Sequence, residues 1–127
     1  MKLVAVSTAV ALLAGCAAMP GSVDPAFDPA ATEFTGWVRF SNDEFQLYGD
    51  EDQVLQPFSR PCVSGAASRD EMREARLDLN NAKVRITGTT RPWSEAANGR
   101  IAHQGSDIRN DCGGAFVIVA DDIRPAN

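Results

Sequence analysis

The sequence is poor in residues that usually perform catalysis, with one histidine and three cysteines among 127 residues. A Ser–His–acid site would need His103 beside an activated serine, but no serine lies in a nucleophile-elbow pattern. The cysteines and histidine lack the spacing of a metal site, and no glycine-rich phosphate loop occurs. Carboxylates are plentiful, but no pair stands out as the acid and base of a glycosidase. We therefore predict no enzymatic activity, no bound metal and no cofactor.

The sequence also lacks an apolar run long enough to cross a membrane as a helix. Residues 3–14 carry no charge, but they number about half of the ~20 residues that a spanning helix requires. They follow the positive Lys2 and end in small residues, which is the pattern of a secretory signal. The N-terminus therefore predicts export.

The end of this signal is the tetrapeptide Leu13-Ala14-Gly15-Cys16, which resembles the lipobox of bacterial lipoproteins. The resemblance covers residues 1–16. It implies a signal peptide over residues 1–15, cleavage before Cys16, diacylglycerol on the Cys16 sulfur and a further acyl chain, such as palmitate, on the new amine. Two or more acyl chains hold a protein firmly on a membrane. The alternative is an ordinary signal peptide that is cut at another small residue.

The resemblance also implies a location. Ala17, rather than an aspartate, follows the cysteine, and in Gram-negative lipoproteins this implies sorting to the outer membrane. We expect a lipid-anchored protein of the bacterial cell envelope, on the outer membrane and facing the periplasm.

After cleavage, 11 basic residues face 17 acidic ones, which gives a net charge near −6. An acidic chain is not attracted to phosphate backbones, so nucleic acid is not an expected partner. Residues 16–33 contain the lipidated cysteine, three prolines and many small residues, and are predicted to form a flexible tether. Residues 34–127 are predicted to form a single small β-rich domain.

Lipidation of Cys16 leaves Cys62 and Cys112 as an even pair. In an exported domain such a pair is a candidate disulfide. Two free thiols are the alternative.

Patterns of polarity predict the elements of the domain. Alternating or apolar runs predict strands over residues 34–40, 45–48, 54–58 (a short edge strand), 83–90 and 115–120. Acidic residues 50–52 are predicted to lie in a solvated loop. Ser68, followed three positions later by Glu71, has the spacing of a capping box and predicts the start of a helix ending near Leu79. Gly88 indicates a bulge or a bend.

The order of these elements resembles an OB-like barrel. Residues 83–88 follow a helix and precede a long loop and a last strand, as the fourth strand does in that fold. We therefore predict a mainly β domain with one helix, a small OB-like β-barrel, with an α+β sandwich as the alternative. The resemblance implies that strands 2–3 and the long loops bind ligands.

Residues 91–111 are too long for a routine connection and form the main candidate for binding. The candidate ligand-binding residues are Arg91, Trp93, Arg100 and Arg109. A tryptophan can stack on a sugar ring, and arginine can hold a carboxylate or phosphate. The alternative for Trp93 is packing against the barrel.

Two functions are consistent with the sequence. The first is a membrane-anchored envelope lipoprotein without enzymatic activity, acting as an accessory or structural component that binds another envelope protein. The second is a binding module for an anionic glycan or cell-wall fragment, which would use the 91–111 loop.

Overall fold

The computed structural model describes residues 27–56 and 59–126. The predicted signal peptide and Cys16 lie outside these residues. The elements in chain order are β1 (Glu33–Ser41), β2 (Glu44–Tyr48), α2 (Glu51–Val54), β3 (Val63–Ala66), α3 (Arg69–Leu79), β4 (Lys83–Pro92), the 3-10 turn η1 (Trp93–Glu95), β5 (Ile101–His103), β6 (Ser106–Ile108) and β7 (Phe116–Pro125). None of the helices in the described ranges is long and apolar enough to span a membrane.

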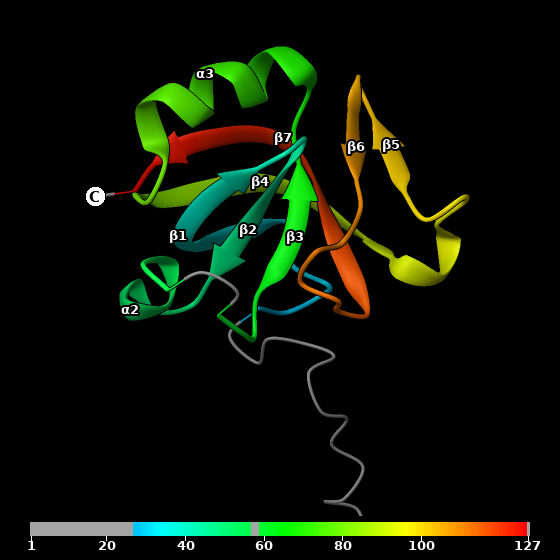
Figure 1. Cartoon of the computed structure of the whole chain (residues 1–127), viewed down its shortest axis with the longest axis horizontal. Helices are drawn as coiled ribbons and strands as arrows, with labels where there is room; N and C mark the ends of the chain where they lie inside the picture. Colours follow the sequence, from blue (N-terminus) through cyan, green and yellow to red (C-terminus); the bar gives the residue numbers. More distant parts are fainter. Residues whose placement is uncertain (1–26, 57–58, 127) are drawn as a thin grey trace, which may run out of the picture.

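Five strands close into a barrel in the order β1-β2-β3-β7-β4, and β4 pairs back onto β1 (Figure 1). Every pairing in the barrel is antiparallel except that of β3 with β7, which is parallel. Along the chain, the helix α3 lies between β3 and β4, which are the third and fourth barrel strands in sequence order. The predicted mainly β, OB-like barrel is therefore confirmed, and the alternative α+β sandwich is not the architecture.

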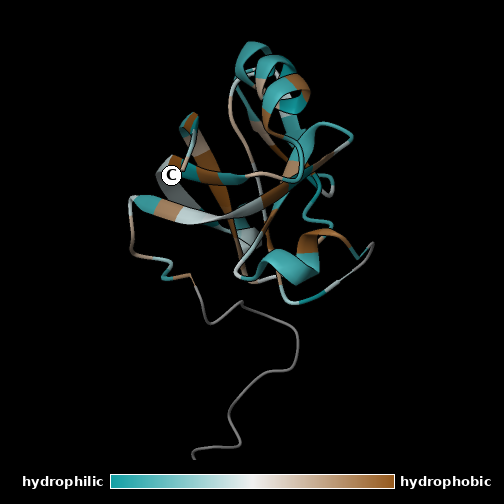
Figure 2. Ribbon diagram, turned by 90° about the vertical axis from the view of Figure 1, so that its left-hand side faces the viewer, coloured by the Kyte–Doolittle hydropathy of each residue, from teal (hydrophilic) through white to brown (hydrophobic). Residues whose placement is uncertain are grey.

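The core of the barrel is built by alternation along its strands. Val38, Phe45, Leu47, Ile86 and Ile118 are fully buried, and apolar positions alternate with polar ones along several strands in Figure 2. The predicted irregularity at Gly88 is also present, because the register of β4 with β7 shifts there. A side chain at this position would overlap the backbone of β7.

The helix α3 begins where the capping pattern predicts. The Ser68 hydroxyl accepts a 3.2 Å hydrogen bond from the backbone amide of Glu71, which satisfies one of the free amides at the helix start. Met72 and Ala75 are buried against the barrel, and Leu79 is half-buried on the same core. One face of the helix therefore holds it on the barrel.

Two predicted elements differ from the structure. Residues 51–54 form the short helix α2, so the acidic loop is partly helical and no strand begins at Val54. Glu51 and Asp52 lie in the first turn of α2, where negative side chains are favoured. Val54 is buried beside Tyr48 and the two domain cysteines, and this burial favours the helical turn over an exposed edge strand. Residues 57–58 of the predicted strand lie outside the described residues.

The packed domain also begins earlier than residue 34. Phe27 is 5% exposed and belongs to the core, with its ring centroid 6.4 Å from that of Phe34. Backbone carbonyls of the same segment are bonded to β4, because Thr32 accepts from the Gly88 amide at 3.0 Å and Pro29 from the Thr90 hydroxyl at 2.6 Å. The last residues assigned to the tether therefore lie on the barrel.

Candidate functional site

Strands β2 and β3 are covered on both sides. Side chains of a strand point alternately to its two faces, yet every residue of β2 and of β3 is buried. The inner face packs into the barrel. The outer face is crossed by residues 109–112, here called the strap, which follow the β5–β6 hairpin. In the fold as a whole β6 lies beside β3 (Figure 1).

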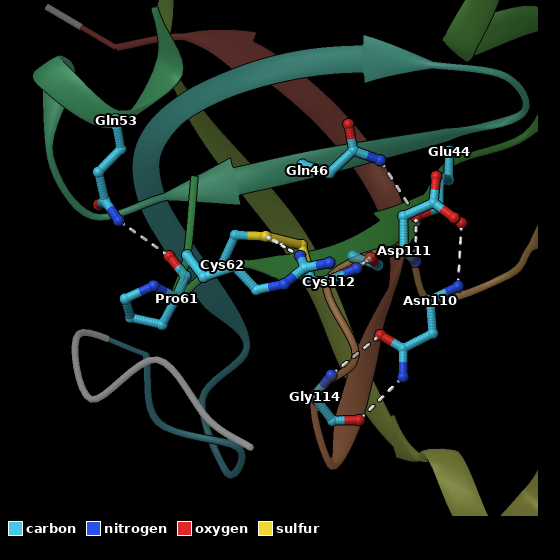
Figure 3. Close-up of a disulfide and its surroundings, with 11 residues drawn as sticks. Glu44, Gln46, Gln53, Pro61, Cys62, Asn110, Asp111, Cys112 and Gly114 are labelled. Atoms are coloured by element: carbon cyan, nitrogen blue, oxygen red, sulfur yellow. Dashed lines mark hydrogen bonds between the residues drawn. A yellow bond between two sulfur atoms is a disulfide. The ribbon is translucent and has the colours of Figure 1, made fainter. Parts of the chain in front are cut away.

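The strap is held by a buried carboxylate at the start of β2. Glu44 is 1% exposed. One of its oxygens accepts from the backbone amide of Arg109 at 2.6 Å. The same oxygen accepts from the amide of Asn110 at 3.0 Å, and the other oxygen accepts from the amide of Asp111 at 3.0 Å (Figure 3). The Gln46 side-chain amide donates a fourth bond of 3.1 Å. These donors offset the loss of hydration of the buried charge.

A disulfide fixes the end of the strap. Cys62 and Cys112 are bonded, with their Cα atoms 5.4 Å apart, which confirms the predicted pair. The amide of Cys112 also donates a 2.9 Å hydrogen bond to the hydroxyl of Ser64 on β3. The strap is thus attached to both strands that an OB-like barrel commonly uses for ligands. Surfaces beside the strap are therefore better candidates for binding than the covered centre of β2 and β3.

One such surface is a hollow of about 300 Å³ between α3, the β1–β2 turn and the hairpin, here called the α3 hollow. Its lining consists of Asp43, Arg69, Met72, Arg73, Arg76, Leu77 and Ser106. The side chain of Arg76 donates to the backbone carbonyl of Asn42 and so joins the helix to the β1–β2 turn. Leu77 is 82% exposed.

Leu77 was not among the residues singled out by the sequence, although a signal existed. Met72, Ala75 and Leu79 define the apolar face of α3, and Leu77 lies off that face. A large apolar residue on the polar side of an amphipathic helix indicates a surface that is covered by something else.

The predicted ligand-binding residues do not form one open loop. Residues 91–92 extend β4, and much of the remaining segment folds into η1 and the β5–β6 hairpin. The segment was predicted to be a loop because its two strands are only three residues long, which is too short to show a periodic pattern.

Each of the four predicted residues has its own neighbours. Arg91 pairs with Glu95 at 3.1 Å, and Arg100 pairs with Asp107 at 3.6 Å. Trp93 is half-buried and packs on the core, while the exposed Arg109 belongs to the strap. None of the four lines the α3 hollow. Their role in ligand binding stays a prediction.

His103 lies half-buried in β5, and its Nε2 atom is 3.0 Å from the carbonyl oxygen of Ala120. Its partner across the hairpin is Ser106, whose hydroxyl donates a 2.8 Å bond to the carbonyl of Ala67. Both side chains therefore connect the hairpin to the barrel. Over residues 27–56 and 59–126, no three His, Cys, Asp or Glu side chains gather in a way that could hold a metal ion.

In comparisons with known proteins, no family model, no curated protein and no solved structure matches this chain.

Proposed function

We propose that this protein is a membrane-anchored lipoprotein of the bacterial cell envelope, without enzymatic activity, that acts as an accessory component by binding another envelope protein. The lipobox at Cys16 supports the anchor and the expected place on the outer membrane. The disulfide between Cys62 and Cys112 supports export independently, because such bonds persist in oxidising compartments and are rare in the cytosol.

The observation that carries protein binding is the exposure of Leu77 beside the α3 hollow. An apolar side chain that is 82% exposed gains stability when a partner covers it. Arg69, Arg73 and Arg76 line the same hollow. Arginine is enriched at protein interfaces and lysine is depleted there, and residues 16–127 contain ten arginines but a single lysine.

The anchor is tested with Cys16→Ser and Ala17→Asp in cells that are labelled with palmitate. We expect Cys16→Ser to lose the label and membrane retention of the processed form. Ala17→Asp keeps the acylated cysteine, so it should retain the label while moving the protein away from the outer membrane. Processed Cys16→Ser that is still membrane-bound would contradict the lipid anchor.

Partner binding is tested by placing a photocrosslinking residue at position 77 in intact cells and identifying the products by mass spectrometry. Leu55 is the matched control, because it is the other exposed large apolar residue of the described chain, at 65%, and lies outside the α3 hollow. We expect one envelope protein to be captured from position 77, not from position 55, and to be lost in Arg73→Glu. Equal capture from both positions would contradict a specific interface on α3.

The second function suggested by the sequence, glycan binding through residues 91–111, is not supported by a specific contact. Two of its four residues are paired with carboxylates of the same segment. It remains a prediction, and the crosslinking experiment does not depend on it.

A further inference from the structure

A second hollow, of about 500 Å³, lies along the outer side of β1 and β2 and is here called the β2 groove. Arg39 and Ser41 of β1, Gln46 and Tyr48 of β2, Arg60 before β3, and Asp111 of the strap are among its lining residues. Gln46 and Tyr48 alternate along β2 with the core residues Phe45 and Leu47, so they lie on the outer face. The groove and the α3 hollow have no lining residue in common.

Tyr48, a lining residue of the groove, carries a polar hydroxyl group. This side chain is 2% exposed, yet its hydroxyl forms no hydrogen bond with any residue of the described part of the chain. A buried polar group without a partner is costly, and most such groups in folded proteins have a partner. The phenol is protonated at neutral pH, since the ordinary pKa of tyrosine is 10.0 and burial raises the pKa of Tyr48 further. The groove therefore contains a hydrogen-bond donor that is available to a ligand.

Two arginines provide positive charge at the same place. Neither Arg39 nor Arg60 forms an ion pair with a carboxylate among the described residues, whereas Arg91 and Arg100 do. Both guanidinium groups are close enough to Tyr48 that their charges act to lower the pKa of the phenol, against the larger effect of burial. Arg60 also donates a 3.8 Å hydrogen bond to the Cys62 sulfur. In a chain with 17 acidic and 12 basic residues, two arginines around one hollow that form no ion pair within the described residues favour an anionic ligand.

The lining also contains one carboxylate, Asp111, which reduces the net charge of the groove to about one positive unit. A monoanion matches this charge, while a phosphate dianion would be repelled by Asp111. A guanidinium binds a carboxylate through two parallel hydrogen bonds. Asp111 can only accept hydrogen bonds when ionised, so it suits a ligand that has hydroxyl groups of its own.

We infer that the β2 groove binds a carboxylate-bearing sugar, with the carboxylate held by Arg39, Arg60 and the Tyr48 hydroxyl, and a sugar hydroxyl donating to Asp111. The volume of the groove falls in the range of small-molecule sites, about 300–1,000 Å³. This inference goes beyond the proposed protein binding. Of the groove's lining residues only Asp111 belongs to the 91–111 segment, and none of the four predicted ligand-binding residues, Arg91, Trp93, Arg100 and Arg109, lines the groove.

The test uses the full chain purified from membranes in detergent, with isotope-labelled tyrosine. Tyr48 is the only tyrosine in the sequence, so one nuclear magnetic resonance signal reports the groove. The probes are N-acetylmuramic acid and N-acetylglucosamine, which differ by a lactyl group with its carboxylate, and inorganic phosphate at equal ionic strength. We expect the acidic sugar to shift the signal and to bind about tenfold more tightly than the neutral sugar, as a charged hydrogen bond permits.

Variants of the groove separate the contacts. Arg39→Gln and Arg60→Gln should each weaken binding of the acidic sugar about tenfold, as measured by calorimetry. Arg73→Gln is the matched control on α3 and should leave the binding of the acidic sugar unchanged. Asp111→Asn should weaken the binding of the acidic sugar but strengthen the binding of phosphate. Arg60 is exposed and Arg39 is half-buried, so the folding of both variants is checked by their melting temperatures.

Equal binding of both sugars, tighter binding of phosphate than of the acidic sugar, or a loss in Arg73→Gln as large as in Arg39→Gln would overturn the inference. So would the absence of any binding. None of these results bears on the partner of the α3 hollow or on the lipid anchor, because the groove shares no residue with either.

Discussion

The backbone amide of Asn110 donates a 3.0 Å hydrogen bond to the buried carboxylate of Glu44, which lies 66 positions earlier in the chain. The same carboxylate also accepts from Arg109 and Asp111 on its two oxygens. A glutamine has one accepting oxygen and one donating nitrogen in place of two acceptors. The attachment of the strap therefore requires a carboxylate and not only a side chain of this shape.

We expect Glu44→Gln to lower the free energy of unfolding by about 3 kcal/mol, because charged hydrogen bonds are lost and a buried amide of the strap is left facing another donor. Urea denaturation measures this change. Glu33→Gln is the matched control. Its partner is Arg85 at 3.7 Å in an exposed pair, which should be worth less than about 1 kcal/mol. Similar losses in both variants would show that the buried carboxylate has no special role.

The disulfide is expected to stabilise the domain further. It joins residues 50 positions apart, and closing a loop of this size contributes about 4 kcal/mol in the chain-entropy model. Reductant should therefore lower the urea midpoint of the natural chain, and it should leave the double variant Cys62→Ser with Cys112→Ser unchanged. A natural chain whose midpoint does not respond to reductant would contradict this contribution.

The barrel strands β1, β2, β4 and β7 could be predicted from alternating or apolar runs, whereas the four-residue strand β3 was not predicted. Val84 and Ile86 alternate with charged residues in β4, and the period of two is visible in the sequence. The start of α3 could also be predicted, because the two residues that signal it, Ser68 and Glu71, lie within one helical turn. Features that depend on neighbouring residues, such as alternation, capping and the bulge at Gly88, were therefore accessible.

Features that depend on residues distant in the sequence could not be predicted. Glu44 lies between the predicted strands 34–40 and 45–48, and nothing near it in sequence shows that its carboxylate accepts from residues 109–111. Phe27 was assigned to the tether because prolines surround it, although its ring packs on Phe34. The β2 groove was missed for the same reason, since Arg39, Arg60 and Asp111 meet only when the barrel closes.

Closure of the barrel depends on a small residue at position 65. Gly65 lies opposite Phe45 on β2 and Ile118 on β7. An added Cβ would overlap the Ile118 carbonyl and lie 2.6 Å from the Phe45 ring. We expect Gly65→Ala to lower the free energy of unfolding by about 2 kcal/mol, which is the usual cost of overpacking.

The control for Gly65 is Gly99→Asn. Gly99 has φ +76° and no atom within 4 Å of its Cβ position, and asparagine tolerates this conformation better than most residues do. Thermal and urea denaturation should show a change below about 0.5 kcal/mol for this variant. Equal stability of both variants would mean that β3 and β7 move apart easily, against the tight packing of the structure.

The titration of Tyr48 offers a direct probe of its surroundings. Burial raises its pKa above the ordinary value of 10.0, and Arg39 and Arg60 act in the opposite direction. We expect phenolate absorbance to appear at higher pH in the folded protein than in urea, and at still higher pH in Arg60→Gln. Identical titrations of the folded and unfolded chain would contradict the burial of this side chain.

The same shift predicts how stability depends on pH. Because the pKa of Tyr48 is higher in the folded state, the unfolded chain releases the phenolic proton first as the pH rises above about 10. The contribution of Tyr48 to stability is complete below that pH and is lost as the pH rises toward the folded pKa. Urea denaturation between neutral and alkaline pH should therefore show a fall that is smaller in Tyr48→Phe. An equal fall in both proteins would assign the alkaline loss of stability to other groups and leave Tyr48 with no part in it.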